Sequence, residues 1–316
     1  MKKKVLLDFD IGTEIDDAIA LAYLLENPDC ELVGITTSCG EAVKRAEMAS
    51  VLCRAAGKKI PIHPGCEEPI LIPQMETRAS QAQVLSRWDH DTGFEPCSAV
   101  PFMQRIIREN PGQITLIATA PMTNLGVLFT MDPEIPSLLA GLYLLCGSPT
   151  HQRFDHVTEV HSAMDRDDLV RHLASLGILE NNSIIDPHAA KIVYRAAGRC
   201  PNFVSVGNNV SSRVFMTPRE AEERFTHPVL KAVFDIAKEW FRDEAYVSFH
   251  DPLAAVLIFH EDVCTYKRGT MDCVLCDNFL SGMTVFREDE NGPHRAAWEI
   301  DEESFFRHLF EVFEGS

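Results

Sequence analysis

The residues Val5-Leu6-Leu7-Asp8-Phe9-Asp10-Ile11-Gly12-Thr13-Glu14-Ile15-Asp16-Asp17 contain the clearest structural pattern in the chain. Residues 4–9 have the apolar run of a short buried strand, and Gly12 marks a turn after it. An apolar helix is predicted over 17–26, because alanine, leucine and isoleucine fill most of its positions. A strand that leads directly into a helix is the first half of a βαβ unit.

The same alternation continues along most of the chain. Further strands are predicted at 31–37, 60–64, 113–119, 142–146, 203–206, 271–276, 283–286 and 295–300. Further helices are predicted at 42–56, 98–109, 123–129, 186–197, 218–225, 228–241, 251–259 and 302–313. This order indicates an α/β fold with a single open, mainly parallel sheet flanked by helices. We expect residues 1–316 to form one domain, with the functional site at the C-terminal ends of the strands.

The composition excludes several classes of protein. The net charge of the 316-residue chain is −18, which is opposite in sign to what binding nucleic acid requires. No segment approaches the roughly 18 apolar residues of a membrane span, and the apolar run 5–7 is too short for a secretory signal. The ten cysteines then fit a reducing compartment, so we expect a cytoplasmic protein. Cys273 and Cys276 are interpreted as part of a buried strand.

Four carboxylates end or follow the first predicted strand, namely Asp8, Asp10, Asp16 and Asp17. Alternation along the strand puts Asp8 and Asp10 on the same side, and the turn at Gly12 brings the later pair back over the strand end. Carboxylates this close raise one another's pKa unless a cation compensates. A hard divalent cation is the natural partner, since Ca²⁺ and Mg²⁺ prefer oxygen ligands. The helix dipole alone accounts for Asp16 or Asp17, but poorly for the first two.

Two later segments are positioned to complete such a cluster. Residues 114–124 form a buried strand and a polar turn, and the backbone carbonyl of Thr119 is a candidate ligand there. The segment Phe249-His250-Asp251-Pro252 precedes an apolar helix. Asp251 fits both the N-cap of that helix and a metal ligand.

Five motifs occur in the order found in the inosine–uridine nucleoside hydrolase family, which this chain resembles over almost its whole length. They are Asp8-x-Asp10-x-Gly12 with Asp16-Asp17, Thr119 with Thr123-Asn124, Glu180-x-Asn182 with Asp186-Pro187, His250-Asp251-Pro252, and Gly282-Met283-Thr284. Each motif alone is modest, but five in order are specific. The resemblance implies an enzyme that hydrolyses the N-glycosidic bond of a ribonucleoside in nucleoside salvage, and a homo-oligomer, either a dimer or a tetramer.

The resemblance also implies a metal centre. Asp10, Asp17, Asp251 and the carbonyl of Thr119 would bind Ca²⁺. Asp10 would in addition act as the general base towards a Ca²⁺-bound water. The ribosyl transition state resembles an oxocarbenium ion, which nearby anionic oxygens stabilise.

The family pattern further implies the residues that hold the substrate. Asp16 and Asn182 would bind the 2′-hydroxyl of the ribose, Asp251 would bind the 3′-hydroxyl together with the metal, and Glu180 would reach the 5′-hydroxyl. His250 would act as general acid on the leaving nucleobase, since histidine titrates near neutral pH.

The chain departs from the family pattern around the sugar. Thr13 and Glu14 are two extra residues in the first motif, and Glu41 stands where the family has asparagine. The segment between Cys146 and Glu180 is longer than usual. Glu41 is expected to replace the asparagine as a sugar contact, and His90 is expected in a loop on the substrate side. These changes predict an unusual nucleoside, and a queuosine-type deazapurine is one candidate.

Two other functions compete with this interpretation. A haloacid-dehalogenase-type phosphatase also begins with Asp-x-Asp at a strand end and binds Mg²⁺, but Gly12 stands where it expects threonine or valine. The other alternative is a non-catalytic nucleoside-binding protein with the same fold. The stretches 73–96 and 148–172 lack clear periodicity and are predicted to lie near one rim of the site. The histidines of the second stretch are not spaced as a metal site.

Overall fold

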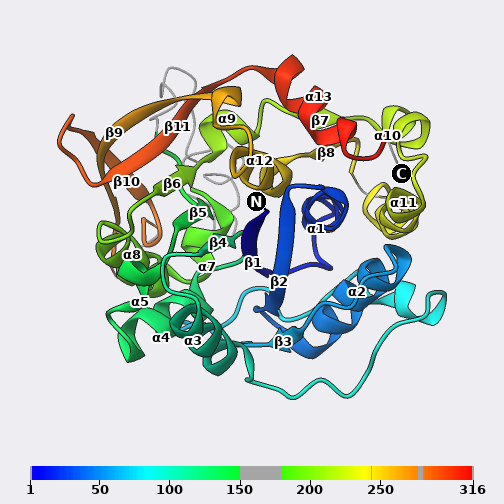
Figure 1. Cartoon of the computed structure of the whole chain (residues 1–316), viewed down its shortest axis with the longest axis horizontal. Coiled ribbons are helices and arrows are strands. Elements are labelled where there is room, and N and C mark those ends of the chain that lie inside the picture. The colour runs from blue at the N-terminus through cyan, green and yellow to red at the C-terminus, as the bar shows by residue number, and fades with distance from the viewer. Residues whose placement is uncertain (1, 150–178, 243, 277–279, 315–316) are drawn as a thin grey trace, which may run out of the picture.

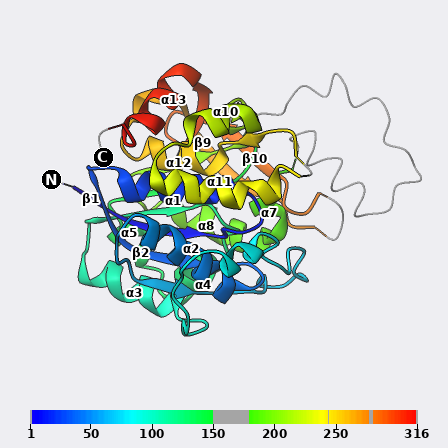
Figure 2. The same ribbon diagram turned by 90° about the vertical axis from the view of Figure 1, so that its right-hand side faces the viewer.

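The fold is built around one large sheet, with helices on both of its faces (Figures 1 and 2). The computed structural model describes residues 2–149, 179–242, 244–276 and 280–314. Its sheet has nine strands in the order β10-β9-β11-β6-β5-β4-β1-β2-β3. Strands β1 to β6 and β11 pair in parallel, whereas β9 and β10 pair antiparallel. The predicted open, mainly parallel sheet is therefore confirmed.

The strands follow the sequence pattern closely in the first two thirds of the chain. Their bounds are β1 (Lys3–Phe9), β2 (Cys30–Thr37), β3 (Ile62–Pro64), β4 (Ile114–Ala118), β5 (Gly141–Leu145), β6 (Phe203–Val206), β9 (Cys264–Cys273), β10 (Thr284–Glu288) and β11 (His294–Ile300). A separate two-stranded sheet pairs β7 (Phe215–Met216) with β8 (Val247–Ser248). Sequence patterns predicted neither of these two, because two residues are too few to show alternation.

The helices cover the two faces of the large sheet. Their bounds are α1 (Asp16–Glu26), α2 (Ala42–Ala55), α3 (Ala99–Glu109), α4 (Thr123–Met131), α5 (Ile135–Leu138), α7 (Asn181–Ile185), α8 (Pro187–Ala197), α9 (Asn208–Ser211), α10 (Pro218–Arg224), α11 (Pro228–Trp240), α12 (His250–Leu257) and α13 (Glu302–Glu311), with short 3-10 turns η1 (Ala82–Ser86) and η3 (Glu261–Val263). None of these helices is both long and apolar enough to cross a membrane.

Alternating residues of β1 divide the core between the two faces. Val5 and Leu7 belong to the cluster formed with α1, α2, α11 and α12, whereas Leu6 packs with α3, α4 and α8. Such alternation is what a strand buried on both faces requires. Helix α1 packs on the sheet beside α12, with α2 and α11 as further neighbours, and all of its residues except the last are buried. This explains why its sequence is apolar on every side.

The structure corrects three sequence-based expectations. Strand β9 begins at Cys264 and not at 271, because its first half carries exposed polar side chains on an antiparallel strand next to the sheet edge. Cys276 lies beyond that strand and is half-buried, so only Cys273 fits the buried-strand interpretation. Helix α12 begins at His250, which places Asp251 in its first turn and not at its N-cap.

The organisation of the chain as one domain remains a prediction. The large sheet supports it, since this sheet contains both β1 and β11, which come from opposite ends of the chain. The predicted start of α10 is confirmed, since Thr217 and Glu220 form a capping box and Pro218 is the first helical residue.

Candidate active site

The chain reverses direction across the sheet between β1 and β4. After β1 it adds β2 and β3 on one side, and it then returns to β4 on the other side. In open α/β sheets, ligands bind outside the carboxyl ends of strands at such a switch point. Asp10 follows β1 and Thr119 follows β4, and the Thr119 amide donates to the Asp8 carbonyl at 2.9 Å. Residues more than a hundred positions apart therefore meet at this edge.

The loop between β1 and α1 is held from below by one buried cation. Arg45 of α2 is completely buried and donates to the backbone carbonyls of Asp10, Ile11 and Gly40, and to the hydroxyl of Thr13. Gly12 has a φ of +116°, and a Cβ there would lie 2.8 Å from the Met48 sulfur. Only glycine fits this turn without strain. The loop is thus fixed both by its own sequence and by α2.

Three carboxylates come together where this loop meets α12. Oxygens of Asp16, Asp17 and Asp251 lie within 4.8 Å of one another, and all three residues are buried. The amide of Asp10 donates to Asp17 Oδ1 at 3.3 Å, and the amide of Asp251 donates to Asp16 Oδ2 at 3.2 Å. Asp10 lines the same cavity as these three residues. The structure therefore brings the side chains of Asp16, Asp17 and Asp251 together, while the Asp10 carboxylate lies in the same cavity close to Cys39 and Glu76.

Asp8, in contrast, does not line the cavity. It is completely buried within β1, where its Oδ1 accepts from Thr36 Oγ1 at 2.6 Å and from Asn124 Nδ2 at 2.7 Å. Burial raises the pKa of Asp8 to about 6, although these two hydrogen bonds oppose the shift. The side chain thus connects β1, β2 and α4 beneath the site.

Burial and mutual repulsion dominate the electrostatics of the cluster. Burial, followed by repulsion from Asp16, raises the pKa of Asp17 to about 7. The same two causes raise the pKa of Asp251 well above its ordinary value. The pKa of Asp10 is also raised well above that value, by burial and by Asp17, although the positive charge of Arg45 opposes the shift. A cluster arranged in this way gains stability from an added positive charge.

The donor atoms at this point suit a hard divalent cation. They are carboxylate oxygens and a backbone carbonyl, which are the ligands that Ca²⁺ prefers. The Thr119 carbonyl accepts Asn182 Nδ2 at 2.6 Å, and a carbonyl oxygen has a second lone pair for a ligand. The hydroxyl of Thr119 is buried at the cavity wall, and its oxygen has no hydrogen-bond partner among the described residues. Asp10, Asp17, Asp251 and the Thr119 carbonyl thus fit the predicted metal site.

We expect the thermal stability of the metal-free protein to fall between about pH 5.5 and pH 7. A carboxyl group whose pKa is raised by folding keeps its proton in the folded state after the unfolded state has lost it, so stability declines with rising pH up to the folded pKa, which is about 7 for Asp17. The fall in Tm should be about 3–6 °C. Differential scanning fluorimetry with a chelator measures it.

Two comparisons isolate the cluster as the cause of this fall. Added Ca²⁺ should raise Tm most at the upper end of the pH range, where the carboxylates are ionised. Asp251→Asn removes one charge from the cluster and should make the fall shallower, with a smaller gain from Ca²⁺. Equal pH slopes for the wild type and this variant, both without metal, would contradict the assignment.

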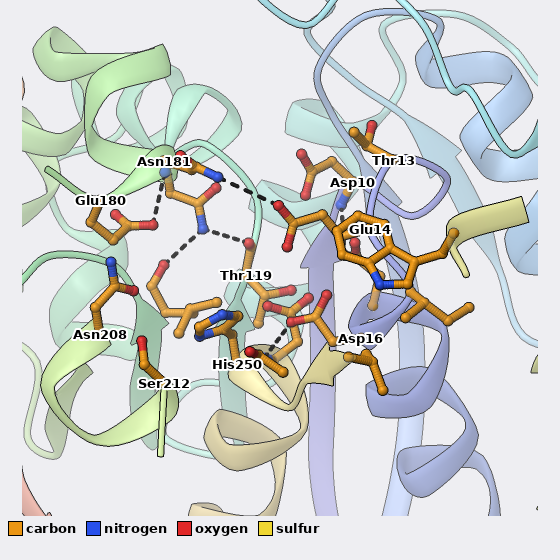
Figure 3. Close-up of a pocket in the computed structure, with 18 of the residues that line it drawn as sticks. Asp10, Thr13, Glu14, Asp16, Thr119, Glu180, Asn181, Asn208, Ser212 and His250 are labelled. Carbon is orange, nitrogen blue, oxygen red and sulfur yellow. Dashed lines mark hydrogen bonds between the residues drawn. The ribbon is translucent and has the colours of Figure 1, made fainter. Parts of the chain in front are cut away.

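The cavity above the cluster has a volume of about 800 Å³, which is large enough for a small organic ligand (Figure 3). Asn182, Glu180 and His250 line it, as the sequence predicted. Glu180 is the N-cap of α7, and its carboxylate accepts from three backbone amides, those of Gly147, Asn182 and Ser183. This capping role was not predicted, and it fixes the position of the Glu180 side chain.

His250 and Asn182 are each oriented by a neighbouring group. The Nδ1 of His250 lies 2.7 Å from the Ser211 hydroxyl, which leaves Nε2 for a ligand. Burial lowers the pKa of His250, and the nearby charge of Asp16 opposes that shift. The Asn182 amide nitrogen donates to the carbonyls of Thr119 and Leu145, which leaves its oxygen for a hydroxyl donor. Both side chains are therefore held before a substrate binds.

The structure does not bring Glu41 and His90 to this cavity. Glu41 has a left-handed φ of 61°, and its carboxylate accepts from Lys44 Nζ at 2.5 Å and from the Ala79 amide at 3.0 Å. The hydrogen bond from Lys44 lowers the pKa of Glu41. His90 lies on the segment after η1, where its Nδ1 contacts the Trp88 carbonyl at 2.9 Å. Neither residue is among those that line the cavity, so the expected sugar contact of Glu41 is corrected.

Several lining residues were not predicted as site residues. They are Thr13, Glu14, Ile15, Glu76, Leu145, Leu179, Asn181, Ile185, Asn208, Ser212, Phe215, Trp240, Glu244, Tyr246, Val247 and Ser248. Glu76 belongs to the aperiodic stretch 73–96, so that stretch reaches the rim as predicted. Most of the second stretch lies outside the described residues, and so do the histidines at 151, 156, 161 and 172.

Comparison with known proteins gives a consistent result. Residues 5–307 match the family model described as inosine-uridine preferring nucleoside hydrolase. The chain is 25% identical over 337 residues to the Crithidia fasciculata enzyme of that name, covering 99% of this chain and 98% of that one. It is 26% identical to uridine nucleosidase 1 of Arabidopsis thaliana, covering 85% and 77%. A pyrimidine-specific ribonucleoside hydrolase of Klebsiella pneumoniae is 24% identical, with 96% of both chains covered.

Solved structures show the same fold. A plant nucleoside hydrolase superposes with a TM-score of 0.77 at 21% identity, covering all of both chains. A purine-preferring ribonucleoside hydrolase from Gardnerella vaginalis superposes with a TM-score of 0.75 at 19% identity, covering 99% of this chain and 98% of that one.

Proposed function

This chain belongs to the inosine–uridine preferring nucleoside hydrolase family, whose members are hydrolases of N-glycosyl compounds, and we propose that it releases ribose and a free nucleobase from a ribonucleoside with Asp10 as the general base and Ca²⁺ as cofactor. The observation that carries the proposal is that Asp10, Asp17, Asp251 and Thr119 line one cavity, where carboxylate oxygens of Asp16, Asp17 and Asp251 lie within 4.8 Å of one another. This donor set favours a hydrolytic centre over the phosphatase alternative, which the family match also opposes.

We assign a separate role in the reaction to each residue of the site. Asp10 takes a proton from the attacking water, which adds to the anomeric carbon as the bond to the base breaks. Bound Ca²⁺ would make that water more acidic and attract the ribose hydroxyls. Asp16 and the Asn182 oxygen share the single proton that the 2′-hydroxyl donates, and their negative potential stabilises the positive charge that develops on the sugar.

The remaining groups act at the two ends of the substrate. Asp251 binds the 3′-hydroxyl, and Glu180 lies on the side of the 5′-hydroxyl. The protonated form of His250 donates a proton from Nε2 to the departing base, and the Ser211 hydroxyl, 2.7 Å from Nδ1, orients the ring. Burial lowers the pKa of His250, which makes this imidazolium a stronger acid. A neutral leaving base departs more readily than an anion, so this proton transfer completes the bond cleavage.

The size of the cavity indicates which kind of nucleobase it can hold. A volume of about 800 Å³ is near the upper end of the range for small-ligand sites, and the two-residue expansion at Thr13 and Glu14 forms part of the wall. These features support a modified or bulky purine-type nucleoside, with a queuosine-type deazapurine as one candidate. The cytoplasmic location and the homo-oligomer stay predictions.

Ribose release tests the proposed function. The purified protein is expected to release ribose from at least one of inosine, uridine and queuosine in the presence of Ca²⁺, and to lose at least about 100-fold of that rate after chelation. A reducing-sugar assay measures the product, and readdition of Ca²⁺ controls for unfolding. Faster turnover of inosine and uridine than of queuosine would remove the queuosine candidate. Tight binding of all three without ribose release would favour the non-catalytic alternative.

A further inference from the structure

We infer that the outer half of the cavity selects nucleosides whose base carries a positive charge, through Glu14, Glu244 and an exposed aromatic rim. This inference rests on the proposed function, because it assumes that the ribose occupies the inner half, next to the aspartate cluster. It adds a chemical class of substrate to that function.

The lining of the cavity is strongly acidic. It includes eight carboxylates, which are Asp10, Glu14, Asp16, Asp17, Glu76, Glu180, Glu244 and Asp251. No lysine or arginine belongs to the lining among the residues that the structure describes. Burial and mutual repulsion raise the pKa of several of them, including Glu14, so their ionised forms need compensating positive charge. One divalent cation at the aspartate cluster offsets two negative charges. The remaining negative potential is focused within the cavity and favours cationic over neutral ligands.

Glu14 extends across the cavity towards Asn181 (Figure 3). It belongs to the two residues that expand the first motif, and its side chain is half-buried. The one hydrogen bond that its carboxylate accepts from a described residue is long, at 3.4 Å from Asn181 Nδ2 on the opposite wall. The carboxylate is therefore held over the cavity without a strong partner in the described part of the chain, and a ligand cation would supply one.

Three aromatic side chains form the outer rim. Phe215 of β7 and Tyr246 before β8 are 55% and 51% exposed, which is high for side chains of this size. Their rings pack edge to face, with centroids 5.7 Å apart. Trp240 at the end of α11 is tied to them, since its Nε1 donates to the Tyr246 carbonyl at 2.9 Å. The rim is thus preorganised, and its ring faces are open to a ligand.

Glu244 lies between Trp240 and Tyr246 in the chain, so an exposed carboxylate accompanies these rings. Aromatic faces attract cations through their quadrupole, and a neighbouring carboxylate adds direct attraction. A neutral base can stack on the rings of this rim, but it gains no electrostatic attraction from the rings or from the carboxylate. The hydroxyl of Thr119, which has no hydrogen-bond partner in the described part of the chain, offers a polar group to a ligand at the inner end of the cavity.

The test compares two nucleosides that differ in charge and hardly in size. One is 7-aminomethyl-7-deazaguanosine, whose amine is protonated at neutral pH, and the other is the neutral 7-ethyl-7-deazaguanosine. Isothermal titration calorimetry on the Ca²⁺-loaded Asp10→Asn protein, which lacks the proposed general base, gives both dissociation constants without turnover of the nucleosides. We expect the cationic nucleoside to bind at least about 10-fold more tightly, and this preference to shrink as salt is added.

Two variants assign the preference to named groups. Glu14→Gln is expected to reduce the preference by about 10-fold, and Glu244→Gln by about 3-fold because that side chain is exposed. The affinity for the neutral nucleoside reports any general loss of folding or binding in each variant, so the ratio of the two dissociation constants measures the effect of charge alone. Glu222→Gln, an exposed acid of α10 outside the cavity, is the matched control and should keep the full preference.

The outcomes separate this inference from the proposed function. Equal binding of the two nucleosides, or a preference that both Glu14→Gln and Glu244→Gln leave unchanged, overturns the inference. The titration does not depend on ribose release. A protein that prefers the cationic nucleoside without releasing ribose would support the charge selectivity while contradicting the hydrolase.

Discussion

Asp10→Asn is expected to lower kcat for ribose release by about 10³-fold or more, while the fold stays intact. Asparagine has the same size as aspartate, but its amide cannot take a proton from the attacking water. Its oxygen can still approach a cation, because Ca²⁺ accepts amide carbonyl ligands as well as carboxylates. The loss should therefore persist when Ca²⁺ is raised to saturation. Steady-state kinetics over a Ca²⁺ titration separates the lost base from weakened metal binding.

The contacts of Asp10 indicate that this substitution should not disturb the surrounding loop. The contact of Asp10 with Asp17 uses the backbone amide, at 3.3 Å, and the contact with Arg45 uses the backbone carbonyl. Neither contact involves the side chain, so the loop should keep its course. Asp29→Asn, at an exposed position after α1, is the control and should leave kcat unchanged. An Asp10→Asn enzyme that retains more than about a tenth of the wild-type kcat at saturating Ca²⁺ would exclude Asp10 as the base.

The position of the site could be predicted from the sequence, because it depends on local patterns. An apolar strand followed by Asp10, Gly12 and Asp17 requires a turn at the carboxyl end of β1. The alternation of strands and helices then places the later Thr119 at the same edge. The structure adds the reason why these segments meet, which is the reversal of strand order between β1 and β4.

Other parts of the site depend on tertiary contacts that no local pattern reveals. Glu41 occupies a position that suggested a sugar contact, yet Lys44 and the Ala79 amide hold its carboxylate outside the cavity lining. Glu76 lines the cavity instead, from an aperiodic segment. The aromatic rim is formed by two-residue strands and a helix end, and these segments are too short to show a periodic pattern in the sequence. Sequence patterns therefore located the inner half of the cavity much better than the outer half.

Arg45 is the clearest example of a residue that only the structure identifies. In the sequence it is one of two basic residues near the start of α2, and a charged helix position is ordinarily exposed to solvent. In the structure it is completely buried beneath the loop that carries Asp10. Its guanidinium lies 4.0 Å from Glu76 and lowers the pKa of both Asp10 and Asp17, although burial outweighs this effect. Arg45 thus offsets part of the negative charge of the site while it binds the loop carbonyls.

Arg45→Met is therefore expected to destabilise the protein by about 3–5 kcal/mol and to lower kcat/KM by about 100-fold beyond the loss of folded protein. The substitution leaves buried carbonyls of Asp10, Ile11 and Gly40 without their donor, and such groups are costly to leave unpaired. The freed loop would hold Asp10 less accurately. Urea unfolding, kinetics at 15 °C below Tm and a Ca²⁺ titration measure the three consequences.

Two further variants show whether this effect comes from positioning or from general destabilisation. Arg45→Lys keeps the charge but loses the planar fork that reaches several acceptors at once, so it should recover part of the stability and less of the activity. Arg54→Met makes the same change at an exposed site on the same helix, where Asp91 is the partner, and should cost less than about 1 kcal/mol. If Arg45→Met keeps wild-type Ca²⁺ affinity and kcat per folded molecule, Arg45 supports only the fold. A loss of both, with Arg45→Lys intermediate, would establish that α2 positions the catalytic aspartate.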